Sequence, residues 1–184
     1  EGISRTLTAK VTATKGYEPP EYKGYGNLAY LGIITCNVGQ PKGSGSKDIE
    51  IIRDGKITRT NLGQYDTFFY RGDPHEEYIG YVFSEAYSFD KVVFTEGMQF
   101  DNGGWFENGT LRIEALIDGS WKKLDVVSEP EYPNGNKQSD FGANFETYTF
   151  TFEPVKASGI RLIGSAGGSM HFISVAELEV YGSR

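Results

Sequence analysis

Residue types that bind sugars gather in one glycine-rich segment, residues 97–110. Trp105 stands there between Asn102 and Asn108. An indole ring offers a flat apolar face to a pyranose, and a side-chain amide both donates and accepts hydrogen bonds, as sugar hydroxyls do. The other interpretation is a loop anchor, because a tryptophan ring needs about 150–250 Å² of cover. The sequence leaves both roles open.

Two further segments, 54–76 and 165–172, carry polar and aromatic side chains but no strand pattern. The first contains Tyr70, Arg71 and His75, and the second contains His171 and Phe172. Long ordered loops on a rigid scaffold are where binding residues concentrate. Where the strands that lead into these loops run the same way, the loops meet at one end of the molecule. We therefore expect one shared binding surface.

Catalysis by these loops is a less favoured alternative. A glycan-cleaving enzyme needs paired carboxylates across a cleft, and other hydrolases need a nucleophile with a base. No Ser lies in a Gly-x-Ser-x-Gly motif, and nothing in the sequence places two acids face to face. The loop carboxylates are Asp66, Asp73, Glu76, Glu77 and Asp101. We expect a non-catalytic domain.

Cell adhesion is a second alternative from another class. Arg71-Gly72-Asp73 is the tripeptide that integrins recognise. A match of three residues arises often by chance, and the neighbouring Pro74 is ordinary in a loop. The sequence therefore favours sugar binding over an adhesion or protein-interaction role.

Period-two alternation predicts the elements that position these loops. Leu111, Ile113 and Ala115 alternate with polar residues, as do Leu178 and Val180, which is typical of strands with one buried face. Asp118-Gly119 is a two-residue hairpin signal. The predicted strands are 6–13, 30–37, 48–53, 77–83, 90–96, 110–117, 120–127, 145–153, 159–164 and 173–181. Many short strands without helix periodicity predict an all-β fold, an antiparallel β-sandwich.

Composition excludes several classes. The chain has 184 residues, enough for one domain with its own core. One Cys cannot form an internal disulfide, and two distant His with that Cys cannot build a structural zinc site. A net charge of −7 without a basic stripe argues against nucleic acid as a partner. No apolar run reaches the roughly 20 residues of a membrane-spanning helix, so we expect no membrane insertion.

The order of several motifs is similar to a known family. Asp54-Gly55, Asp66-Thr67-Phe68-Phe69 and Asn108-Gly109 precede Asp118-Gly119-Ser120-Trp121 and a closing strand, Ala176-Glu177-Leu178-Glu179-Val180. In this order they resemble the discoidin-like (factor V/VIII type C) domain, and within it the bacterial family 32 carbohydrate-binding modules. The resemblance covers about residues 30–182 and implies a discoidin-like jelly roll. We expect residues 30–184 to form this sandwich and residues 1–29 to add a strand and wrap to the same domain.

The resemblance implies one structural Ca²⁺. Carboxylates would come from Asp54 and Glu177, and Thr67 would give its hydroxyl and carbonyl oxygens. Main-chain carbonyls near Ile51, Lys56 and Ala176 would complete a shell of the mixed oxygen type that calcium prefers. The stretch 57–65 is longer than the family's usual link between the first ligands, so the intermediate ligands differ here.

The resemblance also implies a shallow sugar site made of loops at one end. The matching positions are Tyr70, Arg71, His75, Asn102, Trp105, Asn108, His171 and Phe172. We expect a monomeric module that binds glycan and tethers a secreted or cell-surface multimodular enzyme, with other modules of the same polypeptide as neighbours. The identity of the sugar does not follow from these residues.

Overall fold

The computed structural model describes residues 24–70, 72–133 and 145–184. The predicted strand 6–13, most of the N-terminal wrap and Arg71 lie outside the described residues. The strands are β1 (Gly26–Asn27), β2 (Ile33–Cys36), β3 (Tyr65–Asp66), β4 (Glu76–Glu96), β5 (Arg112–Ile117), β6 (Ser120–Lys123), β7 (Val127–Glu129), β8 (Thr147–Ser165) and β9 (Ser174–Ser183). Three short 3-10 helices are η1 (Ala29–Leu31), η2 (Ile49–Arg53) and η3 (Asn61–Gly63).

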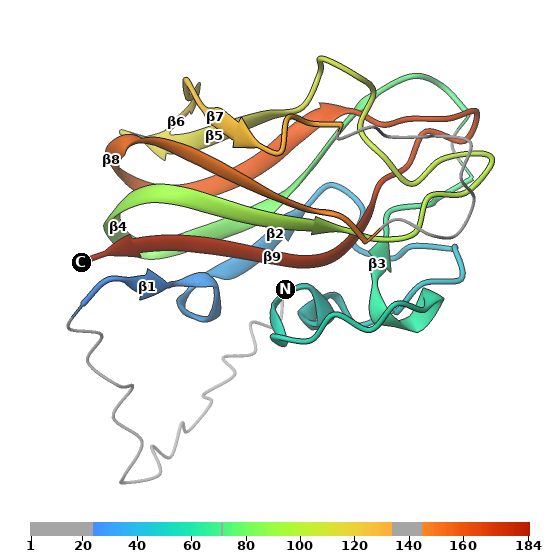
Figure 1. Cartoon of the computed structure of the whole chain (residues 1–184), viewed down its shortest axis with the longest axis horizontal. Coiled ribbons are helices and arrows are strands. Elements are labelled where there is room, and N and C mark those ends of the chain that lie inside the picture. Colours follow the sequence, from blue (N-terminus) through green and yellow to red (C-terminus); the bar gives the residue numbers. More distant parts are fainter. Residues whose placement is uncertain (1–23, 71, 134–144) are drawn as a thin grey trace, which may run out of the picture.

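Two long strands connect the layers of the sandwich. The first part of β4, residues 76–82, pairs with β2 and with residues 159–165 of β8, which also pair with β5. After a register shift between Val82 and Tyr87, the second part of β4 pairs with β9 and with the first part of β8. The β4–β8 pair therefore curves from one layer into the other (Figure 1). All of these pairings are antiparallel, as the sequence predicted.

Apolar side chains of both layers meet in one core. Ile113 and Ala115 on β5 and Leu178 and Val180 on β9 are fully buried, which confirms the predicted buried positions of both strands. Glu114 and Glu177, which the alternation predicted to face solvent, are buried as well. Tyr81 is also fully buried, and its hydroxyl donates a 2.7 Å hydrogen bond to the carbonyl oxygen of Leu178. That bond satisfies the polar end of the ring inside an apolar environment.

The Asp118-Gly119 hairpin is confirmed. Ile117 pairs with Ser120, and the φ angles of Asp118 and Gly119 are 50° and 76°. Positive φ at both central positions defines a type I′ turn, whose twist matches that of the flanking strands.

Six of the predicted strands need correction. Residues 48–53 form η2 and not a strand, because the Asp48 carboxylate accepts the Glu50 N–H and caps a helical turn. The predicted pairs 77–83 with 90–96 and 145–153 with 159–164 are each one continuous strand, β4 and β8. The predicted strand 120–127 is divided into β6 and the start of β7.

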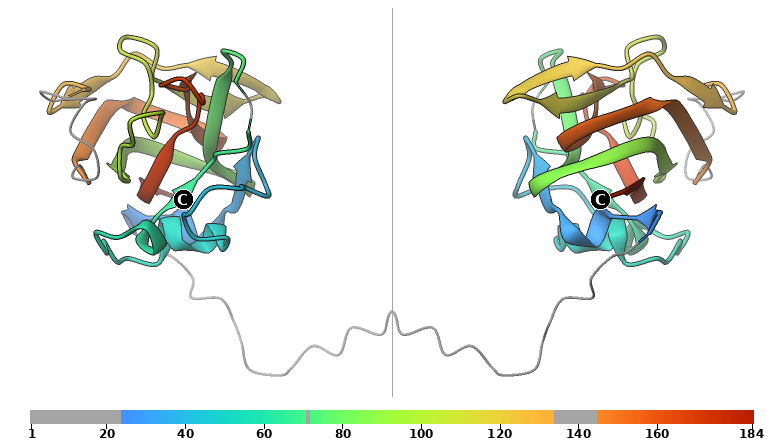
Figure 2. Two further views of the ribbon diagram at one scale, coloured as in Figure 1. Left: turned by 90° about the vertical axis from the view of Figure 1, so that its right-hand side faces the viewer. Right: turned by 90° about the vertical axis from the view of Figure 1, so that its left-hand side faces the viewer.

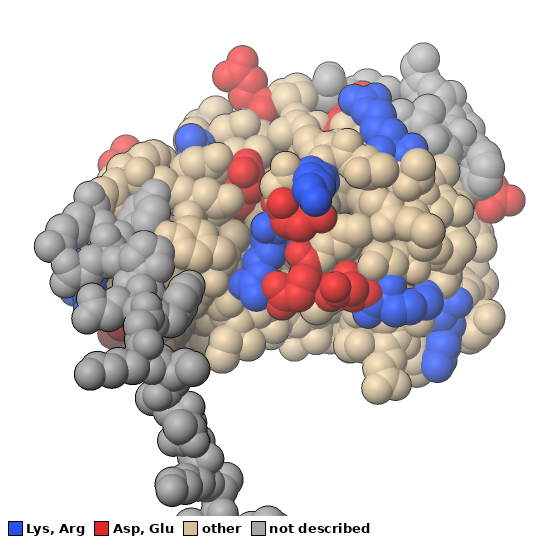
Figure 3. Space-filling view, turned by 90° about the horizontal axis from the view of Figure 1, so that it is seen from below, with Lys and Arg blue, Asp and Glu red and all other residues tan. Residues whose placement is uncertain are grey.

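Charged side chains of both signs are mixed on the surface that carries the 3-10 helices. Figure 3 shows acidic and basic groups next to one another on this face. Arg53 on η2, for example, pairs with Glu50 at 2.7 Å. This face therefore has no basic stripe of the kind that binds nucleic acid.

Among the described residues, no helix is long and apolar enough to cross a membrane.

Candidate functional site

Three segments that are distant in sequence meet at one end of the sandwich, at the right of Figure 1 and facing the viewer in the left panel of Figure 2. The Gly167 N–H donates to the carbonyl oxygen of Trp105 at 2.8 Å, which joins segments 97–110 and 165–172. The Ala166 N–H donates to the carbonyl oxygen of His75 at 3.0 Å, which joins the third segment. The expected convergence of these loops is therefore present.

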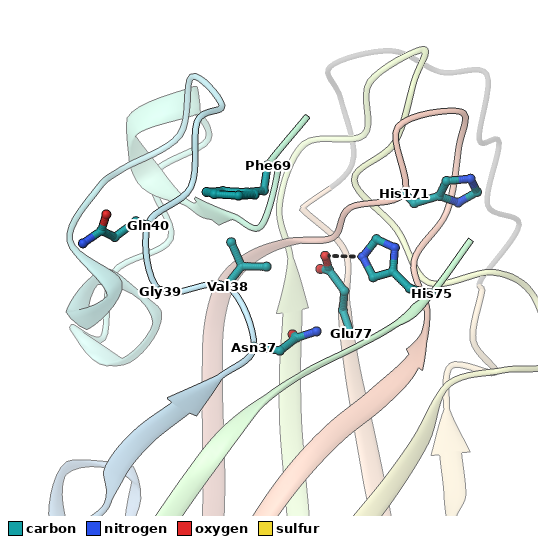
Figure 4. A pocket seen from close by; sticks show the side chains of 8 residues that line it. All are labelled: Asn37, Val38, Gly39, Gln40, Phe69, His75, Glu77 and His171. Atoms are coloured by element: carbon teal, nitrogen blue, oxygen red, sulfur yellow. Dashed lines mark hydrogen bonds and ion pairs between the residues drawn. The ribbon is translucent and has the colours of Figure 1, made fainter. Parts of the chain in front are cut away.

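A pocket of about 530 Å³ opens at this end. It is lined by Asn37, Val38, Gly39, Gln40, Phe69, His75, Glu77 and His171 (Figure 4). Hydrogen bonds hold residues 37 and 38 of this lining in place. The Tyr65 hydroxyl donates to the carbonyl oxygen of Val38 at 2.6 Å, and the Asn37 amide bonds the main chain of Glu76 and of Tyr78.

Phe69 supplies the aromatic wall of the pocket. Its ring is 50% exposed, and Figure 4 shows it extending over the cavity above Val38. Phe68, the residue before it, turns the other way and packs edge-on against Phe172, with a centroid separation of 5.3 Å. Lys42 Nζ lies 5.8 Å from the centroid of the Phe69 ring. Phe69 thus offers the flat apolar surface that one of the two interpretations expected of Trp105.

His75 and His171 lie together at the pocket, with ring centroids 6.2 Å apart. Nδ1 of His171 is 3.1 Å from the carbonyl oxygen of Ala166. Because a carbonyl oxygen only accepts hydrogen bonds, Nδ1 carries a proton, and Nε2 carries a lone pair whenever the ring is neutral. His171 therefore has an acceptor nitrogen of the kind that a sugar hydroxyl can bind.

Glu77 is the carboxylate in the pocket lining. Its side chain is 1% exposed, and its Oε1 lies 2.9 Å from His75 Nε2. Burial raises the pKa of Glu77, although hydrogen bonds from Thr67 and His75 oppose that rise. From the sequence alone, Glu77 was expected only among the loop carboxylates of the catalytic alternative.

The carboxylates considered for catalysis are held apart by different partners. Glu76 pairs with Arg112 at 2.5 Å, Glu77 contacts His75, and Asp66 Oδ2 accepts the Gly45 N–H at 2.7 Å. Of these, only Glu77 lines the large pocket. The described residues therefore present no pair of carboxylates across it, as retaining or inverting hydrolysis would require.

Several predicted sugar-binding residues are not part of the pocket lining. Asn102 and Phe172 line a smaller neighbouring pocket of about 160 Å³. Tyr70 is 71% exposed, and Asn108 lies on an exposed turn. Arg71, and with it the complete Arg-Gly-Asp tripeptide, cannot be placed because it lies outside the described residues.

Trp105 is buried. Its side chain is 6% exposed, and a Cβ atom added at Gly167 would lie 2.1 Å from the indole Nε1. An enclosed ring cannot offer a face to a sugar, so the platform interpretation is wrong for this residue. The structure matches the loop-anchor interpretation, with the indole joining segments 97–110 and 165–172.

The predicted calcium ligands divide into two groups. Glu177 on β9 is 5% exposed; its Oε1 accepts the Gly55 N–H at 3.3 Å, and its Oε2 is buried without a hydrogen-bond partner. Asp54 ends η2, which packs against β9. Thr67 is different, because its hydroxyl is hydrogen-bonded to Glu77 and to the main chain of Ile173.

The Glu177 carboxyl lies in a buried environment close to other carboxylates. Burial raises its pKa from 4.5 to about 7, with repulsion from Asp54 and Glu179 adding to the rise. Across the described residues, no group of three or more His, Cys, Asp or Glu side chains could hold a metal ion. A calcium shell here therefore needs main-chain carbonyl oxygens besides two carboxylates, and those near Ile51, Lys56 and Ala176 remain the predicted donors. Glu177 and Asp54 fit such a shell, and the Thr67 hydroxyl does not.

Several solved structures with a similar fold are carbohydrate-binding modules. One from Clostridium perfringens, in complex with GalNAc-β-1,3-galactose, has a TM-score of 0.58 and 19% identity, over 84% of this chain and 99% of that one. A family 32 module of NanJ from the same organism, in complex with galactose, has a TM-score of 0.58 and 18% identity, over 85% and 98%. A chitosan-binding module from Paenibacillus sp. IK-5 has a TM-score of 0.56 and 16% identity, over 85% and 99%.

These similarities define the fold class. The chain has the discoidin-like β-sandwich fold of family 32 carbohydrate-binding modules. No protein-family model matches the sequence, and no curated protein matches it either.

Proposed function

We propose that this domain is a non-catalytic carbohydrate-binding module, and that the pocket beside Phe69 binds a neutral sugar. The observation that carries the proposal is the half-exposed Phe69 ring over a pocket that also contains two imidazoles. An aromatic face covers the apolar side of a pyranose, and His171 Nε2 accepts a hydrogen bond from a hydroxyl. The similarity in fold to modules that bind galactose, GalNAc-β-1,3-galactose and chitosan supports glycan as the ligand class.

The proposed role is to hold a larger extracellular enzyme on its glycan. The pocket is open at the loop end, so only one or two sugar residues would be covered. Each hydroxyl contact replaces a good hydrogen bond to water and contributes only about 0.5–1.5 kcal/mol net. Affinity for a single sugar should therefore be weak, as suits a module that keeps an enzyme near a polymeric substrate without immobilising it.

The test is calorimetric titration with galactose, GalNAc-β-1,3-galactose and chitosan oligosaccharides. Phe69→Ala should weaken binding of the sugar that wild type binds best by about tenfold or more, which is about 1.4 kcal/mol, because the aromatic face is lost. Tyr30→Ala is the matched control. The Tyr30 ring is 49% exposed, close to the 50% of Phe69, but it lies on η1 outside the pocket lining.

Equal affinity of wild type and Phe69→Ala for every sugar bound would remove this pocket from the proposal. Absence of binding by wild type to all three probes, extended to a glycan array, would reject glycan binding itself. Equal loss in Phe69→Ala and Tyr30→Ala would point to a general effect on the fold.

We also propose that one Ca²⁺ stabilises the domain between η2 and β9. The support is the unpartnered, buried Oε2 of Glu177 and the nearby carboxylate of Asp54. A divalent cation would compensate the burial of negative charge there. Asp54 and Glu177 would hold the ion together with main-chain carbonyls, and the ion would have a structural role with no part in sugar chemistry.

A further inference from the structure

The two ring nitrogens of His75 are both engaged by the protein. Nδ1 lies 2.7 Å from the carbonyl oxygen of Asp73, and Nε2 lies 2.9 Å from Glu77 Oε1. A carbonyl oxygen accepts and never donates, so Nδ1 carries a proton. The contact between Glu77 Oε1 and His75 Nε2 is then a hydrogen bond with one proton, which is carried by one of these two atoms and accepted by the other. Neither nitrogen of His75 is left to accept a hydrogen bond from a ligand.

Glu77 is itself held from its other side. Its Oε2 accepts the hydroxyl proton of Thr67, and the Thr67 oxygen accepts the Ile173 N–H at 2.9 Å. These contacts make one continuous chain of hydrogen bonds from the start of β9, through Thr67 and Glu77, to the His75 ring. The Ile173 N–H and the Thr67 hydroxyl are donors in this chain, and the Thr67 hydroxyl also lies 3.4 Å from the carbonyl oxygen of Ile173.

A carboxylate in this place is costly for stability alone. Glu77 is 1% exposed, and burying an ionisable group costs free energy that an apolar side chain of similar volume avoids. The location instead matches a role in the pocket, since Glu77 lines the cavity beneath Phe69 and orients the imidazole next to it (Figure 4). The His75 ring is thereby held in one orientation. Of the two histidines, His171 is then the one whose Nε2 lone pair can accept a hydrogen bond from a ligand.

We infer that Glu77 is a positioning residue of the glycan pocket, which holds His75 so that neither of its nitrogens can accept a ligand hydroxyl and leaves that role to His171. This rests on the proposed function. It also defines the ligand class further: the sugar needs a free hydroxyl that donates to His171 while an apolar ring face lies against Phe69. A sugar methylated or deoxygenated at that hydroxyl should not bind.

Nitrogen-15 NMR of the histidine rings tests the inference without any ligand. In wild type, Nδ1 of His75 should carry a proton, and the Nε2 shift should be displaced from that of a lone-pair nitrogen. In Glu77→Ala at the same pH, Nε2 should move to the lone-pair value while Nδ1 stays protonated. An unprotonated Nδ1 in wild type, or the same Nε2 shift in both proteins, would overturn the inference. The wild-type spectrum alone decides whether Nδ1 of His75 is protonated, even if Glu77→Ala does not fold.

Sugar titration then tests the positioning role. Glu77→Gln should keep affinity within about twofold, because the amide can accept from Thr67 and donate to His75 Nε2, whereas Glu77→Ala should lose at least about fivefold. Unchanged affinity in a folded Glu77→Ala with an altered ring would reject the positioning role. If wild type binds none of galactose, GalNAc-β-1,3-galactose and chitosan oligosaccharides, the glycan role of Glu77 falls with the proposed function, while the NMR result still decides whether Glu77 holds His75.

Discussion

Trp105→Ala should lower the free energy of unfolding by about 3–5 kcal/mol, the usual loss for deleting a large buried aromatic side chain. The indole is 6% exposed and touches the main chain at Gly167, so its removal leaves a cavity between two of the converging segments. Urea unfolding followed by fluorescence or circular dichroism measures the effect. Affinity for sugar, measured on the folded fraction, should change much less than in Phe69→Ala.

Trp105→Phe is the control for this substitution. The indole Nε1 is buried and has no hydrogen-bond partner among the described residues, so a phenyl ring fills much of the space without an unsatisfied donor. We expect Trp105→Phe to retain most of the stability that Trp105→Ala loses. Unaltered stability of Trp105→Ala together with abolished sugar binding would contradict the anchor role and restore the platform interpretation.

Glu177→Gln should be more stable than wild type when calcium is absent and less stable than wild type when calcium is present. Without metal, the folded-state pKa of Glu177 is raised by burial from 4.5 to about 7. A raised pKa contributes stability below pH 4.5, and this contribution is lost as the pH rises through about 7. At pH 8 with EDTA, the neutral Gln should therefore be more stable than wild type by up to about 3 kcal/mol, and this advantage should shrink toward pH 5.

With excess Ca²⁺ the order should be the opposite. A ligand that binds only the folded state adds about 2.7 kcal/mol at 100 times its Kd, and wild type should gain this stability while Glu177→Gln gains little. Thermal unfolding at pH 8, with EDTA or with Ca²⁺, measures both effects. A wild-type melting temperature that does not respond to Ca²⁺, with no metal found by elemental analysis, would reject the calcium proposal.

Much of the fold was predictable because it follows from local patterns. Alternation on β5 and β9 identified their buried faces, and Asp118-Gly119 identified the hairpin turn. Residues 48–53 were misassigned because the apolar run Ile49-Glu50-Ile51-Ile52 is ambiguous between a short strand and a helical turn. The Asp48 cap decides between them, and its geometry depends on the surrounding loop.

Strand continuity could not be read from the sequence. Polar residues such as Ser84 and Glu85 interrupt the apolar pattern of β4 and predict a loop between two strands. In the structure these residues lie where β4 passes between the layers, with pairing to β8 resumed after a register shift. Long-range pairing therefore overrides the local signal.

The candidate site was predicted in part. Both histidines were identified, and they do meet at the loop end. Phe69 was missed because Phe68 and Phe69 are chemically alike, and only packing of Phe68 against Phe172 shows which of the two is exposed. Segment 37–40 was missed because its residue types and spacing carry no motif that indicates a binding role.

The sequence by itself determined the class of fold and the loops that carry polar and aromatic groups, because alternation and turn chemistry act over a few neighbouring residues. Only the tertiary structure decided that the Trp105 ring is enclosed, that the Phe69 ring is open, and that Glu77 reaches His75. Exposure and hydrogen-bond partners depend on segments brought together from distant parts of the chain, and no local pattern records which of them will meet.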